Sequence, residues 1–157
     1  MSNYLIPLMV VVPMLCAILV NAFAKFNKSI KVLTFVVAIC LPIIPLLSNY
    51  GLHFFGGYTP MLDNATGVIY HPAITYAFDM LQQIFIVAVG LITFLVAFIY
   101  LSKYKKASGQ YLFLLFMGTA SVTALMLTDD IFNMFVFFEI LALVQVGIVI
   151  ASPMDYS

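Results

Sequence analysis

The amino-acid sequence predicts an all-α integral membrane protein with five transmembrane helices, and its composition and apolar runs lead to this fold class. Hydrophobic residues make up 65% of the 157 residues, and charged residues only 8%. A soluble domain of this length needs far more polar side chains to cover its surface. The apolar runs are continuous rather than alternating, which excludes a transmembrane β-barrel. Because a lone strand would leave its backbone unpaired in lipid, each run is expected to be a helix.

A transmembrane helix needs about 17 to 25 mostly apolar residues. The segments that meet this length are residues 6–23, 30–47, 77–101, 111–127 and 131–151. Pro42 and Pro45 fall in the last two turns of the second segment, where they are expected to bend or end the helix. The first segment has no positively charged n-region and no small-residue cleavage site. We therefore expect it to remain as a membrane helix, within a single membrane domain that covers the chain.

The lysines predict the orientation. They form two clusters, one around the connection between the first and second segments (Lys25, Lys28, Lys31) and one between the third and fourth (Lys103, Lys105, Lys106). The other two connections contain no lysine. By the positive-inside rule both clusters are cytoplasmic, which puts the N-terminus outside and the C-terminus inside. We expect a multi-pass protein of the cell (plasma) membrane.

Residues 48–76 form the only sizeable expected extramembrane piece. The turn signals Gly56-Gly57, Pro60 and Asp63-Asn64 predict a short hairpin-like loop on the outer side, with a strand at residues 67–70. The two histidines of this loop have no Cys or His at ligand spacing beside them, so neither a metal nor another cofactor is expected.

Several function classes lack support. The net charge is zero and the chain has no basic face for nucleic acid. It has no phosphate loop, no Ser-His-Asp arrangement and no C-x-x-C motif, so no catalytic residue is assigned. Cys16 and Cys40 lie in apolar segments and are expected to be buried free thiols.

Glu139 is the residue on which a functional interpretation depends. It lies eight residues into the fifth segment, about 12 Å along a helix axis, near the middle of a hydrocarbon core about 30 Å thick. The neighbours on its helix face are all apolar, namely Phe132, Phe135, Val136, Ala142, Leu143 and Val146. A partner must therefore come from another helix. Glu139 is either part of a proton or ion path or a protonated acid that hydrogen-bonds between helices.

The other carboxylates near the spans are candidates of a different kind. Asp129 and Asp130 precede the fifth segment, where aspartate caps free backbone N–H groups. An ion-access role for Asp130 is the alternative. Asp79, at the outer side of the third segment, is a cap, a solvated charge or part of an access path. The aromatic run at residues 132–138 and the small residues at 118–124 are expected to pack against other helices.

The stretch LTDDIFNMFVFFEILALVQVGIV, read with TYAFDMLQQIFIVAVGLITFLVAFIYLSKY upstream, resembles the antiporter-like membrane subunits. This family includes the D subunit of Mrp-type cation/proton antiporters, the proton-pumping subunits of respiratory complex I, and the ion-translocating subunits of energy-converting hydrogenases. The shared pattern is D-[IL]-F-N, here residues 130–133, followed by aromatic residues and Glu139. The resemblance implies that Glu139 belongs to a buried charged axis and pairs with a lysine on a later helix.

The family's large subunits have about fourteen helices, built partly from inverted repeats. The resemblance therefore implies that this chain corresponds to the first five helices of a larger subunit. It is either a fragment of a longer protein or a split subunit completed by another polypeptide.

Three hypotheses follow. In the first, the chain is part of a membrane subunit that moves H⁺ or Na⁺ within an antiporter or a redox complex, with other membrane subunits as partners. In the second, it is a structural or assembly subunit in which Glu139 is protonated and hydrogen-bonded. In the third, a quinone-reactive subunit, only His53 and the loop tyrosines could serve, and this hypothesis ranks last.

Overall fold

The computed structural model describes residues 5–49, 51–55, 58–63, 67–72, 75–105 and 108–151. In these residues it contains five helices, α1 (Leu5–Ala22), α2 (Asn27–Leu46), α3 (Met80–Lys103), α4 (Gly109–Leu127) and α5 (Ile131–Ala151). Each is long and apolar enough to cross a membrane. The prediction of five apolar helices of membrane-spanning length is confirmed, and α5 has the predicted bounds.

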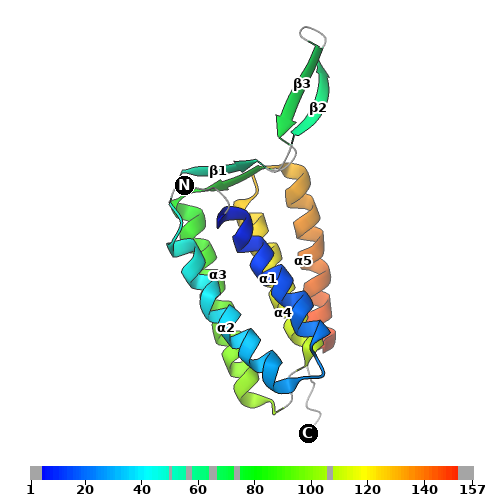
Figure 1. The fold of residues 1–157 in the computed structure, drawn as a ribbon. Helices are drawn as coiled ribbons and strands as arrows, with labels where there is room; N and C mark the ends of the chain where they lie inside the picture. Colours follow the sequence, from blue (N-terminus) through cyan, green and yellow to red (C-terminus); the bar gives the residue numbers. More distant parts are fainter. Residues whose placement is uncertain are drawn as a thin grey trace.

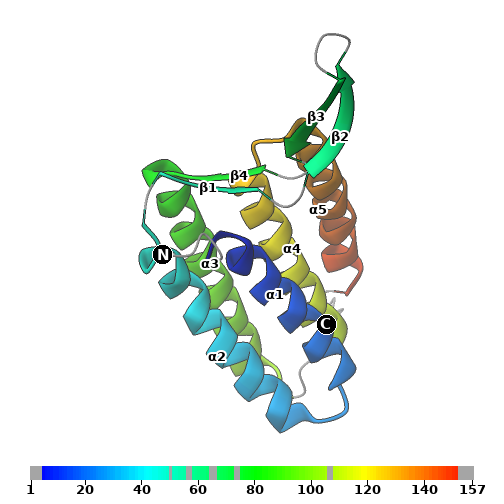
Figure 2. The ribbon, with the colours of Figure 1, turned by 45° about the horizontal axis from the view of Figure 1, so that its top comes forward.

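The first four helices form a closed bundle, and α5 stands outside it (Figure 1). Around the bundle, α1 packs against α2 and α4, and α3 packs against α2 and α4. The fifth helix packs against α4. Successive helices run in opposite directions, so that the α1–α2 and α3–α4 connections lie at one end and the strands at the other (Figures 1 and 2).

Small side chains allow α4 to have neighbours on three sides. The buried residues of its middle and end include Thr119, Ala120, Ser121, Thr123 and Ala124. The hydroxyl of Thr119 lies within hydrogen-bonding distance, 2.9 Å, of that of Thr93 on α3, and each hydroxyl also lies 2.9 Å from a backbone carbonyl oxygen of its own helix. The prediction that this small-residue stretch serves helix packing is confirmed.

The prolines of α2 lie inside the helix, which ends at Leu46, one residue after Pro45. Pro42 faces Gly90 of α3 so closely that a Cβ at residue 90 would lie 2.8 Å from the Pro42 nitrogen. The backbone carbonyl of Pro45 accepts hydrogen bonds from the Ser48 N–H at 3.2 Å and from the buried Gln83 Nε2 at 2.8 Å. The last turn of α2 is thus tied to α3.

Four strands connect α2 to α3. Strands β2 (Tyr58–Asp63) and β3 (Gly67–Pro72) form one antiparallel pair, which projects away from the bundle (Figure 1). Strands β1 (Leu52–Phe55) and β4 (Thr75–Phe78) form a second antiparallel pair that lies across the end of the bundle (Figure 2). The sequence predicted a hairpin here but not the second pair.

The predicted start of the third helix at residue 77 is wrong. Ala77 and Phe78 pair with His53 and Leu52 in the β1–β4 sheet, and the helix begins at Met80. Phe78 is fully buried among residues of α1, α3 and α4. Its apolar side chain therefore belongs to the core at the strand end of the bundle, and it comes from a strand and not from a membrane helix.

Both lysine clusters lie at one end of the bundle and are joined by hydrogen bonds. The Lys31 Nζ donates to the carbonyl oxygen of Tyr104 at 3.1 Å and to that of Leu101 at 3.5 Å. The Asn27 Nδ2 donates to the carbonyl oxygen of Lys105 at 2.9 Å. The positive-inside rule requires both lysine clusters to lie on the same side of the membrane, and they lie at the same end of the bundle. That this side is the cytoplasmic one stays a prediction.

Several sequence expectations concern single residues. Cys16 and Cys40 are both free thiols, but only Cys16 is buried. The expectation of burial is wrong for Cys40, because it lies on the side of α2 opposite the inward-facing Ala38 and Leu41. Gly56, Gly57, Asn64 and Lys106 lie outside the described residues, as do the side chains of His53 and His71.

Candidate functional site

Asp130 caps the first turn of α5. Its Oδ1 accepts a hydrogen bond from the Phe132 N–H at 3.2 Å, and its Oδ2 accepts one from the Asn133 N–H at 3.3 Å. Free N–H groups at a helix start attract a carboxylate both by hydrogen bonding and through the helix dipole. The predicted capping role of Asp130 is confirmed.

The rest of the D-I-F-N stretch completes the start of α5. The side chain of Asn133 is buried, and its Nδ2 donates to the Thr128 Oγ1 at 3.0 Å. The Asp129 N–H donates to the carbonyl oxygen of Thr75 in β4 at 3.0 Å. These bonds join the start of α5 to the β1–β4 sheet, so the part of the motif before the aromatic residues has a structural purpose.

Asp79 stands at the start of α3, as Asp130 does at the start of α5. It is exposed and stands at the N-cap position of the helix. Its backbone N–H donates to the Gln82 Oε1 at 3.1 Å, which is one half of a capping box. Of the three roles that the sequence left open, the position of Asp79 supports the cap.

Glu139 lies near the middle of α5 and is exposed. Most of the apolar residues that share its face are exposed too, among them Phe132 to 75%, Phe135 to 67% and Leu143 to 70%, whereas Val136 is half-buried. The described residues therefore leave most of this face uncovered. Within the described part of the chain, no hydrogen bond or ion pair of the Glu139 carboxylate is found.

The opposite face of α5 meets the bundle. Asn133 and Val144 are its buried residues, and they are three helical turns apart. At about 100° per residue, Glu139 lies about 140° around the helix from Val144. The packing of α5 on α4 consequently turns the carboxylate away from the four-helix bundle.

Among the described residues, three members of the aromatic run do not pack against another helix, so for them the expectation of helix packing stays a prediction. Phe132, Phe135 and Phe138 are exposed, and Phe137 is partly buried against the bundle. Among the described helices, α5 packs mainly against α4, so these helices cover mainly one side of it.

The three candidate carboxylates are not brought together. Asp79 and Asp130 lie at the strand end of the bundle, and Glu139 lies nine residues beyond Asp130, about 13 Å along α5. Among the described residues, no group of three or more His, Cys, Asp or Glu side chains could hold a metal ion. The structure thus presents one carboxylate in the middle of α5 and two at helix starts.

Five helices of membrane-spanning length define the class, a multi-pass membrane protein. No protein-family model matches the chain. It is 38% identical over 150 residues to the uncharacterized protein MJ1309 of Methanocaldococcus jannaschii, a match that covers 96% of this chain and 30% of that protein.

Among solved structures, the chain is similar to part of one chain of the membrane-bound sulfane sulfur reductase, an archaeal respiratory membrane complex. The TM-score is 0.68 at 22% sequence identity, over 88% of this chain and 28% of the other. At this low sequence identity, the similarity shows that the two chains share a fold. The chain spans less than a third of the length of each of these two proteins.

Proposed function

We propose that this chain is the five-helix part of a larger membrane subunit that moves H⁺ or Na⁺ within a redox or antiporter complex of the plasma membrane. The observation that carries the proposal is the position of Glu139, in the middle of a membrane-length helix and on its uncovered apolar face. Support comes from the resemblance to antiporter-like subunits and from the fold likeness to a chain of a respiratory membrane complex.

The energetics require that something covers this face. A carboxylate at the centre of a bilayer costs about 3 kcal/mol or more unless it is paired or hydrated. The four-helix bundle cannot supply the partner, because α5 turns Glu139 away from it. We therefore place the remaining part of the subunit, or a second polypeptide, against the Glu139 face. The lengths of the matched proteins leave room for such a part.

Asp79 and Asp130 have a secondary role in the proposed ion transport. Both begin helices at the strand end of the bundle, where an ion would approach from the outer side if the lysine end is cytoplasmic. As caps they stabilise α3 and α5 whether or not an ion passes. Their charges would raise the local concentration of cations at that end.

The deciding experiment is Glu139→Gln in the full-length protein within its native complex. Ion-coupled activity is measured in membrane vesicles, and assembly is followed by co-purification of the other subunits. We expect coupling to be lost while the complex still assembles, because glutamine keeps the size and the hydrogen bonding but cannot carry a proton or attract a cation. The matched control is Asp129→Asn, which removes an exposed carboxylate at the start of the same helix.

The alternative is a structural or assembly subunit in which Glu139 is protonated and hydrogen-bonded between helices. In that case Glu139→Gln keeps wild-type coupling, because glutamine can make the same kind of hydrogen bond. Unchanged coupling in the presence of full assembly would overturn the transport proposal and leave the scaffold function in its place.

A further inference from the structure

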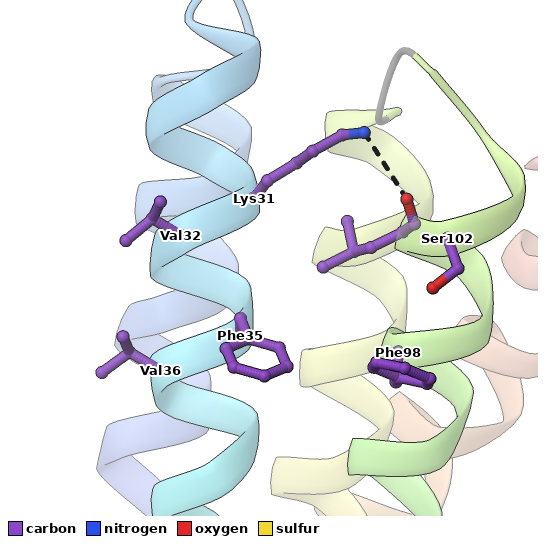
Figure 3. Close-up of a pocket in the computed structure, with 7 residues that line it drawn as sticks. Lys31, Val32, Phe35, Val36, Phe98 and Ser102 are labelled. Carbon is purple, nitrogen blue, oxygen red and sulfur yellow. Dashed lines mark hydrogen bonds between the residues drawn. The ribbon is translucent and has the colours of Figure 1, made fainter.

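A groove lies between α2 and α3 close to the lysine end of the bundle (Figure 3). Its volume is about 320 Å³, and its walls are formed mainly by Val32, Phe35, Val36 and Phe98. Val32 is 63% exposed and Phe98 50%, so the groove is open along its length. The walls are almost entirely apolar, and Lys31 and Ser102 supply the polar groups at one end.

Lys31 is held at that end by the last turn of α3. Its ammonium donates to the carbonyl oxygens of Tyr104 and Leu101, and Figure 3 shows its side chain crossing from α2 toward α3. A lysine ammonium has three N–H donors. Two of them are directed at carbonyl oxygens, and the third is left for another acceptor beside the groove.

The charge around this end has one sign. Lys25, Lys28, Lys103 and Lys105 are exposed there, in addition to Lys31. The carboxylates of the described helices lie elsewhere, since Asp79, Asp129 and Asp130 are at the strand end and Glu139 is in the middle of α5. Within the described residues, no acidic side chain therefore neutralises this end.

We propose that the groove binds an anionic membrane phospholipid, with one hydrocarbon chain against Phe35, Val36 and Phe98 and the phosphate at Lys31. An apolar trough that ends in a basic cluster complements a molecule with a long apolar tail and an anionic head. Basic pockets between membrane helices bind anionic headgroups for this reason. A transmembrane helix in the same groove would bury the walls but leave the lysines without a counter-charge.

The test uses the full-length protein in detergent, titrated with phosphatidylglycerol and with phosphatidylcholine and followed by native mass spectrometry. We expect saturable binding of phosphatidylglycerol. Lys31→Gln should weaken it about fivefold, the effect of one lysine near an anionic headgroup, and Lys31→Arg should keep it. Val36→Trp places a large ring in the open groove and should abolish the binding. The matched control is Lys25→Gln, which loses the same charge outside the groove and should weaken the binding clearly less than Lys31→Gln does.

Several outcomes would overturn the proposal. Equal losses for Lys31→Gln and Lys25→Gln would mean a diffuse attraction to the basic surface. Full competition by inorganic phosphate would mean a simple anion site without a lipid tail. A third such outcome is that the Val36→Trp variant leaves phosphatidylglycerol binding unchanged while its thermal transition shows that the protein is folded. This result would mean that the lipid sits elsewhere or that another segment of the protein fills the groove.

Discussion

Val144 of α5 packs over Gly118 of α4, so that a Cβ at residue 118 would lie 3.2 Å from Val144 Cγ1. A second contact of the same kind follows at Gly147, where a Cβ would lie 2.9 Å from Leu114 Cδ2. A glycine on each helix thus receives an apolar side chain of the other, as is common between membrane helices. These two contacts determine the rotation of α5, and with it the direction in which Glu139 points.

A matched pair of glycine substitutions tests where the backbone of the neighbouring helix leaves no room for an added methyl group. Gly118→Ala and Gly90→Ala gain the same helix propensity, about 1 kcal/mol. At residue 118 the new methyl would lie 3.2 Å from Val144 Cγ1, so α5 must shift by a few tenths of an ångström, and we expect this small cost to offset the gain and leave stability nearly unchanged. At residue 90 it meets the Pro42 backbone at 2.8 Å, and we expect a loss of about 1–3 kcal/mol. Thermal unfolding of the full-length protein in detergent measures both, and equal effects would show that α2 can move away from α3.

The hydroxyl pair of Thr93 and Thr119 should give a measurable coupling between α3 and α4. In a double-mutant cycle of Thr93→Val and Thr119→Val, we expect a coupling energy of about 0.6 kcal/mol, the average for hydrogen bonds between membrane helices. The control is Thr34→Val. The buried Thr34 Oγ1 has no hydrogen-bond partner among the described residues, so its loss should be neutral or stabilising. A cycle that sums to zero would contradict the interhelical bond.

Two substitutions of Asp130 separate the stabilisation of α5 by its capping hydrogen bonds from the stabilisation by its charge. Asp130→Ala removes both and should destabilise the protein by about 1 kcal/mol. Asp130→Asn keeps a good cap and removes only the charge. We expect the asparagine variant to have near wild-type stability in thermal unfolding. The control is Asp129→Ala, which removes the neighbouring carboxylate and leaves the cap in place. Equal destabilisation by alanine and asparagine would mean that charge, and not hydrogen bonding, stabilises the start of α5.

Spin labels can show whether protein covers the Glu139 face. In a full-length protein with Cys16 and Cys40 replaced by alanine, labels at Leu143→Cys and Val36→Cys report collisions with dissolved oxygen. If another part of the subunit packs against α5, the label at residue 143 should be protected from oxygen and immobilised. The label at residue 36, in the open groove, should be accessible to oxygen in the bilayer. High accessibility at residue 143 would mean that Glu139 faces lipid, which the transport proposal cannot accommodate.

The local properties of this chain were predictable because they depend on neighbours in sequence. The length and apolar content of each run predicted the five helices, and the aspartate before α5 predicted its cap. The periodicity of an α-helix predicted correctly which residues share the face of Glu139. The exception was the start of α3, where Ala77 and Phe78 have the apolar character of a span but pair with β1 instead.

The sequence by itself determined that this is a multi-span helical protein with one carboxylate near the middle of its fifth helix, because hydrophobic length and helix period are local quantities. Only the tertiary structure decided that α5 packs mainly against α4, that the described residues leave Phe132, Phe135 and Phe138 uncovered, and that Lys31 closes one end of a groove between α2 and α3. These features depend on how helices rotate and pack against one another. In the uniformly apolar α5, hydrophobicity does not mark a preferred face, so the contacts of Gly118 and Gly147 select it.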